Sequence, residues 1–387
     1  MGKYCQGRIR GDFKKIEMKK ILILFGTRPE AIKLVPVIQE LRKYPRTFKI
    51  VICVTAQHRQ MLDQVLEPFS IRPDYDLNVM QVNQKLTELT ANILLSMEEV
   101  LKKERPDLVL VQGDTTTTFV EALAAFYHKI SVVHIEAGLR TYNKFHPYPE
   151  EINRQLVSTL ADLHFAPTDL AKKNLMKGGI DKSKIFVTGN TIVDALYMIS
   201  KKIHNVNFLK EIDFQNEKLL LITAHRRENF GRPLTEICRA IKEIVRNNPE
   251  VEAIYPVHLN PSVQKTARKI LGGVERVHLI KPLAYIDFLY LMSKCYLILT
   301  DSGGIQEEAP SFGKPVLVLR EVTERPEAIM IGTAKLVGSN RNNIVNQAEI
   351  LLYNKTAYNK MIKRVNPYGD GKASKRIVST LKRVLKE

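Results

Sequence analysis

Several features are scarce in this chain of 387 residues, and each absence excludes a class of protein. The four cysteines lie far apart with no CxxC spacing, which argues against a disulfide framework and against a zinc site. The longest apolar stretches, such as Ile21–Phe25, are strand-sized and far short of the roughly 20 residues of a membrane span. The basic N-terminal stretch contains no apolar segment of the signal-peptide kind. We therefore expect a cytoplasmic protein without a membrane-spanning helix.

Common catalytic motifs are also missing. The chain has no HExxH metal motif, no P-loop, no close dinucleotide GxGxxG and no GxSxG nucleophile elbow, so we expect neither a metal nor a cofactor. The formal net charge is +18, but lysine and arginine are spread over the predicted surface helices without the aromatic and basic signatures of RNA or single-strand binding. We expect no nucleic-acid partner; a cationic surface suits a small polyanion such as a nucleotide diphosphate equally well.

The pattern of apolar runs predicts an α/β protein with two doubly wound, Rossmann-like domains. Short apolar runs alternate with amphipathic stretches, which is typical of parallel sheets covered by helices on both faces. The predicted strands are Lys20–Phe25, Lys49–Thr55, Leu108–Gln112, Ser131–Ile135, Leu163–Ala166, Leu219–Thr223, Ala253–Val257, Val277–Ile280, Tyr296–Thr300 and Pro315–Leu319. The polar segment His204–Glu217 is predicted to belong to the connection between the domains. The basic, helical stretch Gly371–Glu387 is predicted to pack back across the first domain.

Polar and charged residues follow the predicted strands, at the edge where doubly wound sheets bind ligands. Asp114 and Glu136 follow neighbouring strands, so the fold would bring two carboxylates into one cleft, where like charges raise a pKa and suit proton transfer. The alternatives are an N-cap role for Asp114 and a salt bridge from Glu136 to Arg140. For Glu150, at a helix start, the residues alone favour a solvated helix face with a Glu150–Arg154 pair.

A second candidate site is the junction where a buried strand ends in Ser-Gly-Gly and a helix begins. Ser302 is predicted to cap this helix and to offer its hydroxyl to a phosphate, while Gly303 and Gly304 allow close approach of the backbone. Glu307 or Glu308, one turn later, can accept hydrogen bonds from ribose hydroxyls. The alternative is an ordinary helix N-terminus with a glycine turn.

Three basic side chains near the ends of other strands are further candidates. Arg28 and Lys33 follow the first strand and can neutralise phosphate or hold a carboxylate in place. His225, at the end of a strand in the second half, suits phosphate contact or protonation of a leaving group, with a structural role as the alternative.

Seven blocks of sequence carry a family resemblance. They are Phe25–Ala31, Thr55–Arg59, Gln112–Thr118, His134–Arg140, Pro149–Arg154, His225–Asn229 and Asp301–Pro310. Together, and in this order from about Met18 to the C-terminus, they resemble the non-hydrolysing UDP-N-acetylglucosamine 2-epimerases. The resemblance implies a glycosyltransferase-B-like homodimer with an active-site cleft between two domains, residues 19–189 plus 369–387 and residues 190–368. Residues 1–18 are expected to form a disordered extension, with Met18 as a possible true start.

The resemblance also implies a reaction, the interconversion of UDP-N-acetylglucosamine (UDP-GlcNAc) and UDP-N-acetylmannosamine (UDP-ManNAc). In this family UDP is eliminated to give a 2-acetamidoglucal, and readdition then takes place on the opposite face. Because the C2 proton is not very acidic, rupture of the anomeric bond must lead, so stabilisation of the departing UDP matters as much as the base. Carried over, the catalytic residues are Asp114, Glu136, Glu150 and His225. Residues carried over to UDP-sugar binding are Arg28, Lys33, Arg154, Phe288 at the uracil, Ser302, Gly303, Gly304, Glu308 at the ribose, and Arg325.

Some bacterial members of this family use a second UDP-GlcNAc as an obligatory activator beside the active site. The positions that match the activator pocket are Gln57, Gln60, Arg226, Glu228 and His258. Asn83 stands where the activated members carry an arginine, which puts retention of this activation in question. Two other activities stay open: a hydrolysing epimerase that releases ManNAc and UDP, and a UDP-sugar glycosyltransferase.

Overall fold

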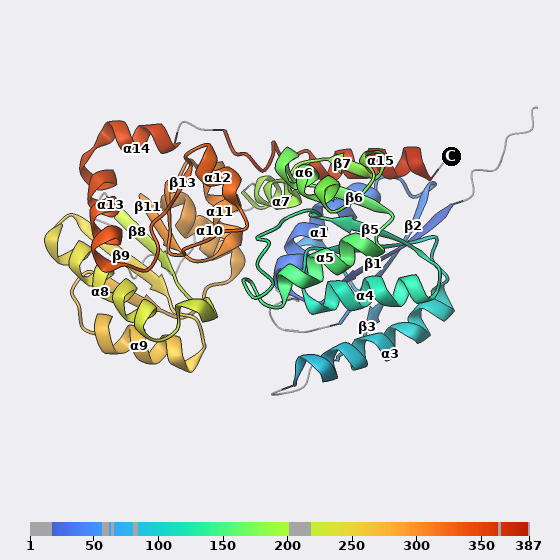
Figure 1. Cartoon of the computed structure of the whole chain (residues 1–387), viewed down its shortest axis with the longest axis horizontal. Helices are drawn as coiled ribbons and strands as arrows, with labels where there is room; N and C mark the ends of the chain where they lie inside the picture. Colours follow the sequence, from blue (N-terminus) through green and yellow to red (C-terminus); the bar gives the residue numbers. More distant parts are fainter. Residues whose placement is uncertain are drawn as a thin grey trace, which may run out of the picture.

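The computed structural model describes residues 18–55, 62, 66–79, 84–200, 218–362 and 365–385. Two parallel sheets follow one another along the described chain, each surrounded by helices (Figure 1). Among the helices of these residues, none combines the length and the apolar character that crossing a bilayer requires. The predicted connection His204–Glu217, the N-terminal segment Met1–Glu17, and Gln57, Gln60 and Asn83 lie outside the described residues.

The first sheet is entirely parallel, in the strand order β3-β2-β1-β4-β5-β6-β7. Its strands are β1 (Lys19–Phe25), β2 (Phe48–Val54), β3 (Tyr75–Asp76), β4 (Leu108–Gln112), β5 (Ser131–Ile135), β6 (Leu163–Ala166) and β7 (Ile185–Val187). The accompanying helices are α1 (Arg28–Leu41), α3 (Leu86–Glu104), α4 (Thr116–Tyr127), α5 (Glu150–Leu160), α6 (Asp169–Lys177) and α7 (Thr191–Ser200).

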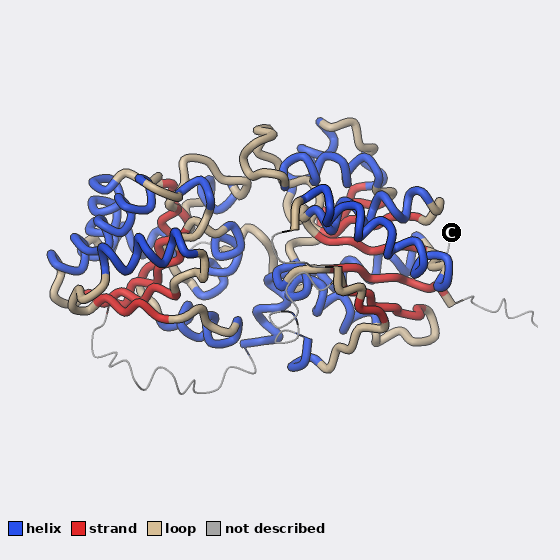
Figure 2. Tube along the Cα trace, turned by 90° about the horizontal axis from the view of Figure 1, so that it is seen from below, coloured by secondary structure: helices blue, strands red, loops and turns tan. Residues whose placement is uncertain are grey.

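The second sheet repeats the plan in the order β10-β9-β8-β11-β12-β13. Its strands are β8 (Lys218–Thr223), β9 (Val251–Pro256), β10 (Val277–Ile280), β11 (Leu297–Thr300), β12 (Val316–Val318) and β13 (Ala334–Leu336). The helices that follow are α8 (Arg232–Asn247), α9 (Pro261–Leu271), α10 (Tyr285–Lys294), α11 (Gly303–Glu308), α12 (Pro326–Met330), α13 (Arg341–Tyr353), α14 (Lys355–Ile362) and α15 (Ala373–Val384). Figure 2 shows the two sheets as separate sets of strands.

The strand order confirms two doubly wound sheets and indicates at which edge such sheets bind ligands. In the first sheet β1 pairs with both β2 and β4, and in the second β8 pairs with both β9 and β11. At each of these points the direction of winding reverses, and in such folds ligands bind outside the carboxyl ends of the central strands. The strands themselves are buried on both faces, as the continuous apolar runs predict.

Most predicted strands lie at or within two residues of their predicted bounds. The prediction missed β3, β7 and β13, which contain two or three residues each and are too short to show a periodic pattern. The strand predicted over Pro315–Leu319 is shorter than expected, because only Val316–Val318 form the ladder.

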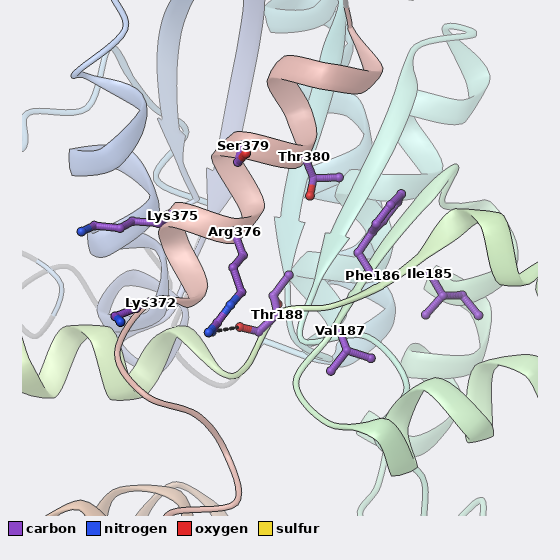
Figure 3. A pocket seen from close by; sticks show the side chains of 9 residues that line it. All are labelled: Ile185, Phe186, Val187, Thr188, Lys372, Lys375, Arg376, Ser379 and Thr380. Atoms are coloured by element: carbon purple, nitrogen blue, oxygen red, sulfur yellow. Dashed lines mark hydrogen bonds between the residues drawn. The ribbon is translucent and has the colours of Figure 1, made fainter.

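Helix α15 lies against the first sheet's helices, although it follows the whole second sheet in the chain (Figure 1). It packs on α1 and α7, and its N-terminus is capped by Asp194 of α7. The Asp194 carboxylate accepts hydrogen bonds from the backbone N–H groups of Ala373 (3.0 Å) and Ser374 (2.8 Å). On its other side α15 faces β7. Arg376 of α15 donates a hydrogen bond to the carbonyl of Thr188, the residue after β7 (3.0 Å; Figure 3). The cavity beside them, about 540 Å³, is lined by none of the predicted site residues.

Candidate functional site

Glu136 occupies the centre of the first sheet's carboxyl edge. It follows β5 with a φ of 65°, in the left-handed region, which is uncommon for a residue with a side chain and occurs often at functional sites. The side chain is buried, and Lys33 of α1 donates to its Oε2 at 2.5 Å. Gln112 at the end of β4 donates to the same oxygen. Burial raises the pKa of Glu136, and Lys33 offsets this effect only in part. The alternative salt bridge to Arg140 is not formed, because Arg140 donates to the Ser158 hydroxyl.

Asp114 lies at the end of the neighbouring strand β4 and faces Arg154 of α5. Its Oδ2 is 2.5 Å from Nη2 of Arg154, a charge-assisted contact. Burial opposes ionisation of Asp114, but Arg154, Arg325 and Lys33 together outweigh it and hold the pKa of the carboxyl below its usual value. The N-cap alternative is wrong, since Thr115 caps α4 by accepting a hydrogen bond from the Thr118 N–H.

Helix α5 does not present a solvated face at its start, contrary to the interpretation from the residues alone. Arg154 and Glu151 are buried, and Arg154 contacts Asp114 and Glu151 in place of the predicted i,i+4 partner Glu150. The Oε2 atom of Glu150 is buried without a hydrogen-bond partner. Burial, and then the charge of Asp114, raises the pKa of Glu150. The carboxyl edge thus holds one carboxylate with a lowered pKa beside two with raised pKa values, a pattern that suits acid–base chemistry.

Asp301, which sequence reasoning did not select, organises the end of the second sheet. Its completely buried Oδ2 accepts hydrogen bonds from the backbone N–H groups of His225 and Arg226, both at 2.8 Å, and from Nδ2 of Asn229 at 2.9 Å. These bonds hold the backbone of His225 and Arg226 at the end of β8, and the His225 ring stacks on His258 with ring centroids 5.4 Å apart. Burial lowers the pKa of His225. The sequence signal that could have indicated this role is the position of Asp301 between an apolar strand and the Ser-Gly-Gly turn.

The Ser-Gly-Gly junction lies between β11 and α11 as predicted, but the first glycine makes room for a protein side chain. Ser302 occupies the N-cap position of α11, yet its side chain makes no capping hydrogen bond. A Cβ on Gly303 would lie 2.5 Å from Nη1 of Arg325, so the glycine admits this guanidinium. A Cβ on Gly304 would meet no atom closer than 3.9 Å. The Arg325 guanidinium thus leaves little room for a side chain at position 303, whether or not a ligand is bound.

Glu308 lies at the end of α11 in an environment suited to a hydroxyl-rich ligand. Tyr285 of α10 donates to its Oε1 at 3.1 Å, and burial raises the pKa of Glu308 to about 7. Arg28, at the start of α1 in the first half, is electrostatically coupled to both Glu308 and Tyr285. Phe288, one turn further along α10, is partly buried against the core.

Charged side chains connect the two halves of the chain directly. Lys33 lies 3.4 Å from Glu307, Arg325 lies 3.5 Å from Glu136, and Arg154 lies 3.9 Å from Glu324. Glu324, another residue that sequence reasoning missed, also contacts Arg325 at 2.5 Å. Glu136 and Lys33 of the first half therefore lie against Glu307 and Arg325 of the second, where the two halves meet.

The described residues of the predicted activator pocket gather beside His225. Arg226 lies 3.8 Å from Glu324, and Glu228 accepts a hydrogen bond from Arg320 at 2.6 Å. His258 stacks on His225, as described above. Across the part of the chain that the structure covers, no group of three or more His, Cys, Asp or Glu side chains is arranged to hold a metal ion.

Comparison with known proteins identifies the family. Residues 39–382 match the family model described as UDP-N-acetylglucosamine 2-epimerase. The UDP-N-acetylglucosamine 2-epimerase of Campylobacter jejuni is 52% identical, covering 94% of this chain and 97% of that protein. The enzyme of the same name from Bacillus subtilis is 54% identical, covering 94% of both chains.

Solved structures agree with this assignment. The Neisseria meningitidis UDP-GlcNAc 2-epimerase bound to UDP-GlcNAc is 53% identical and superposes with a TM-score of 0.90, covering 95% of this chain and all of that one. The Methanocaldococcus jannaschii UDP-GlcNAc 2-epimerase in complex with UDP-GlcNAc and UDP is 38% identical with a TM-score of 0.83, covering 94% of this chain and 99% of that one. The two sheets described above thus form a glycosyltransferase-B-like fold, and the chain belongs to the UDP-N-acetylglucosamine 2-epimerase family.

Proposed function

We propose that this enzyme interconverts UDP-GlcNAc and UDP-ManNAc without hydrolysis, by eliminating UDP to form 2-acetamidoglucal and adding UDP back on the opposite face. One observation carries the proposal. Asp114, Glu136 and Glu150 follow the carboxyl edge of the first sheet, where Asp114 acts electrostatically on Glu150, and Lys33 and Arg325 join Glu136 to Glu307 of the Ser302–Glu308 segment in the other half. Relatives that share this fold have been solved with UDP-GlcNAc and with UDP.

The two halves would divide the chemistry. In the second half, the Ser302 hydroxyl, which makes no capping bond, and the Gly303 and Gly304 backbone would hold the diphosphate, with Glu308 at the ribose and Phe288 at the uracil. Stabilising the departing diphosphate favours rupture of the anomeric bond.

In the first half, a carboxylate would take the C2 proton as that bond breaks. Asp114 has a lowered pKa, and Glu136 and Glu150 have raised pKa values, so the group offers both a proton acceptor and proton donors. Lys33 holds Glu136 and Arg154 holds Asp114, while Arg28, Arg325 and His225 would balance the diphosphate charge.

Product analysis separates this activity from its two alternatives. Incubation with UDP-GlcNAc alone, followed by NMR, should show UDP-ManNAc accumulating to an equilibrium mixture. Free ManNAc with stoichiometric UDP would instead indicate a hydrolysing epimerase. Conversion only in the presence of an acceptor sugar would indicate a glycosyltransferase, which has no need for three carboxylates opposite the nucleotide cradle.

We further propose a second UDP-GlcNAc site that includes Arg226, Glu228 and His258, together with Gln57 and Gln60 from the first half. Its support is the stacking of His258 on His225 and the contact of Arg226 with Glu324, a residue that also lies 3.9 Å from Arg154 of the first half. A ligand there would contact both halves.

The proposed enzyme is a cytoplasmic homodimer, and light scattering would test the dimer by its mass in solution. Each chain would have two domains, residues 19–189 plus 369–387 and residues 190–368.

A further inference from the structure

Four charged side chains form a closed ring across the cleft. Glu136 contacts Lys33 through Oε2 (2.5 Å) and Arg325 through Oε1 (3.5 Å). Glu307 contacts the same two cations, Arg325 through Oε1 (2.8 Å) and Lys33 through Oε2 (3.4 Å). Each acid of the ring therefore touches both bases, and each base touches both acids.

The ring is buried and is shared between the two halves. Lys33 and Glu136 come from the first half, while Glu307 of α11 and Arg325 before α12 come from the second. None of the four is more than 8% exposed, and Glu307 is completely buried. Ion pairs in such surroundings are screened little by solvent, so the loss of one member leaves uncompensated charge on the other three.

This placement separates Glu307 from its neighbour Glu308. Either residue could have been the ribose acceptor on sequence grounds, but Glu307 has both carboxylate oxygens against cations, whereas Glu308 faces the Tyr285 hydroxyl. Glu307 thus has a function inside the protein, and Glu308 is the better candidate for ligand contact.

We propose that Glu307 is a positioning residue for the epimerase reaction: it holds Lys33 and Arg325 against Glu136 and, by its own negative charge, makes the Glu136 carboxylate a stronger base than the two cations alone would leave it. The role of Glu136 in proton transfer rests on the proposed function. The arrangement of the ring does not depend on it.

The direction of the effect follows from the charges around Glu136. Facing it are Lys33 from α1, Arg325 before α12, Glu307 from α11 and the neutral Gln112 at the end of β4, with Asp114 on the adjacent strand end. With Glu307 present, two cations are shared between two acids. Without its charge, Lys33 acts on Glu136 alone, while Arg325 acts on Glu136 and on Glu324 (2.5 Å). The positive field at Glu136 therefore increases and favours its ionised form, so its pKa should fall.

The test is the pH dependence of kcat/KM for Glu307→Gln against wild type. The limb that reports Glu136 should move to lower pH by roughly one unit, while the other limb stays in place. Glu307→Asp keeps the charge and should restore the limb towards its wild-type position. Glu40→Gln removes a buried acid of α1 that is paired with Lys43 and is outside the ring, and should leave both limbs unmoved.

A second readout does not need catalysis. With ¹³C-labelled glutamate carboxyls, the Glu136 resonance, identified by its loss in Glu136→Gln, should titrate at lower pH in Glu307→Gln than in wild type. An unmoved or raised midpoint would overturn the proposal. If wild type shows no epimerisation but the midpoint still falls, the proposed function fails while the ring assignment stands.

Discussion

At the residue scale, the three carboxylates of the first half have different surroundings. Asp114 is paired with Arg154, Glu136 with Lys33, and Glu150 has a buried oxygen without a partner. The unpaired oxygen costs stability where it is, because a buried polar atom without a hydrogen bond loses its hydration. Such a cost at the edge of a ligand cleft is expected where the group has a chemical task.

We predict that Asp114→Asn, Glu136→Gln and Glu150→Gln each lower kcat by at least about a hundredfold, the usual scale for a lost acid–base group, while UDP binding survives. Rates from coupled UDP-ManNAc detection and UDP affinities from calorimetry would measure this. Glu98→Gln is the control, because Glu98 is a half-exposed helix residue paired with Lys102. Near-normal turnover in any of the three variants would return that carboxylate to a structural role.

Sequence reasoning selected Asp114 and Glu136 because parallel strands place their carboxyl ends at one edge, whereas Glu150 was selected only through the family resemblance. It could not find their partners. Glu136 and Arg325 are separated by almost half the chain, and their contact depends on how the two sheets face each other, which no local pattern encodes. Arg154 was assigned to a solvated face because the helix start is polar, although that face is buried in the cleft.

At the scale of elements, the junction between β11 and α11 depends on the space above Gly303. We predict that Gly303→Ala lowers the free energy of unfolding by roughly 1–3 kcal/mol, because the new methyl group overlaps the buried Arg325 guanidinium. Gly304→Ala is the matched control; its methyl group has room, and alanine is the better helix former, so stability should be unchanged or slightly higher. Urea unfolding would compare them. Equal stability of the two variants would show that Arg325 can move aside.

The pairing of β5 with β6 brings two buried histidines together, and it predicts a loss of stability in acid. His134 and His164 are register partners with no exposed surface, and burial lowers the pKa of His164 to about 4. In the unfolded chain this imidazole takes up a proton near its ordinary pKa of about 6.5. Its contribution to stability is therefore complete above that pH and is lost as the pH falls towards 4.

Between pH 6.5 and 4, titration of His164 should lower the free energy of unfolding of the wild type by up to about 3 kcal/mol. His164→Gln should remove this part of the fall. Urea unfolding across the range would measure it, with exposed His146→Gln as the control. Parallel pH curves for wild type and His164→Gln would be the contradicting result. The strands that carry these histidines were predicted with their observed bounds, but their pairing register was not, because it is set by the sheet as a whole.

At the scale of the whole molecule, the two halves are joined by charge across the cleft and by α15, which follows the second sheet but packs on the first. A ligand that contacts both halves should therefore affect the reaction at the active site between them. In the proposed second site, Asn83 replaces a long cation, and a lost charge-assisted hydrogen bond is worth about 1.5–3 kcal/mol, or roughly tenfold to hundredfold in affinity.

We predict that the reverse reaction, started from pure UDP-ManNAc, shows a lag that small amounts of UDP-GlcNAc relieve. Because linkage is reciprocal, a ligand bound in the active site should also tighten the second site. Asn83→Arg should lower the UDP-GlcNAc concentration that relieves the lag. Immediate conversion at full rate would show that these residues no longer form an activator site.

The central claim is that a carboxylate of the first half removes the C2 proton while the second half holds the departing UDP. The most direct measurement is the reaction of UDP-GlcNAc in deuterated water, with the products resolved by NMR. We predict UDP-ManNAc carrying deuterium at C2 and, at equilibrium, deuterium at C2 of the UDP-GlcNAc as well. UDP-ManNAc that forms without deuterium would contradict it.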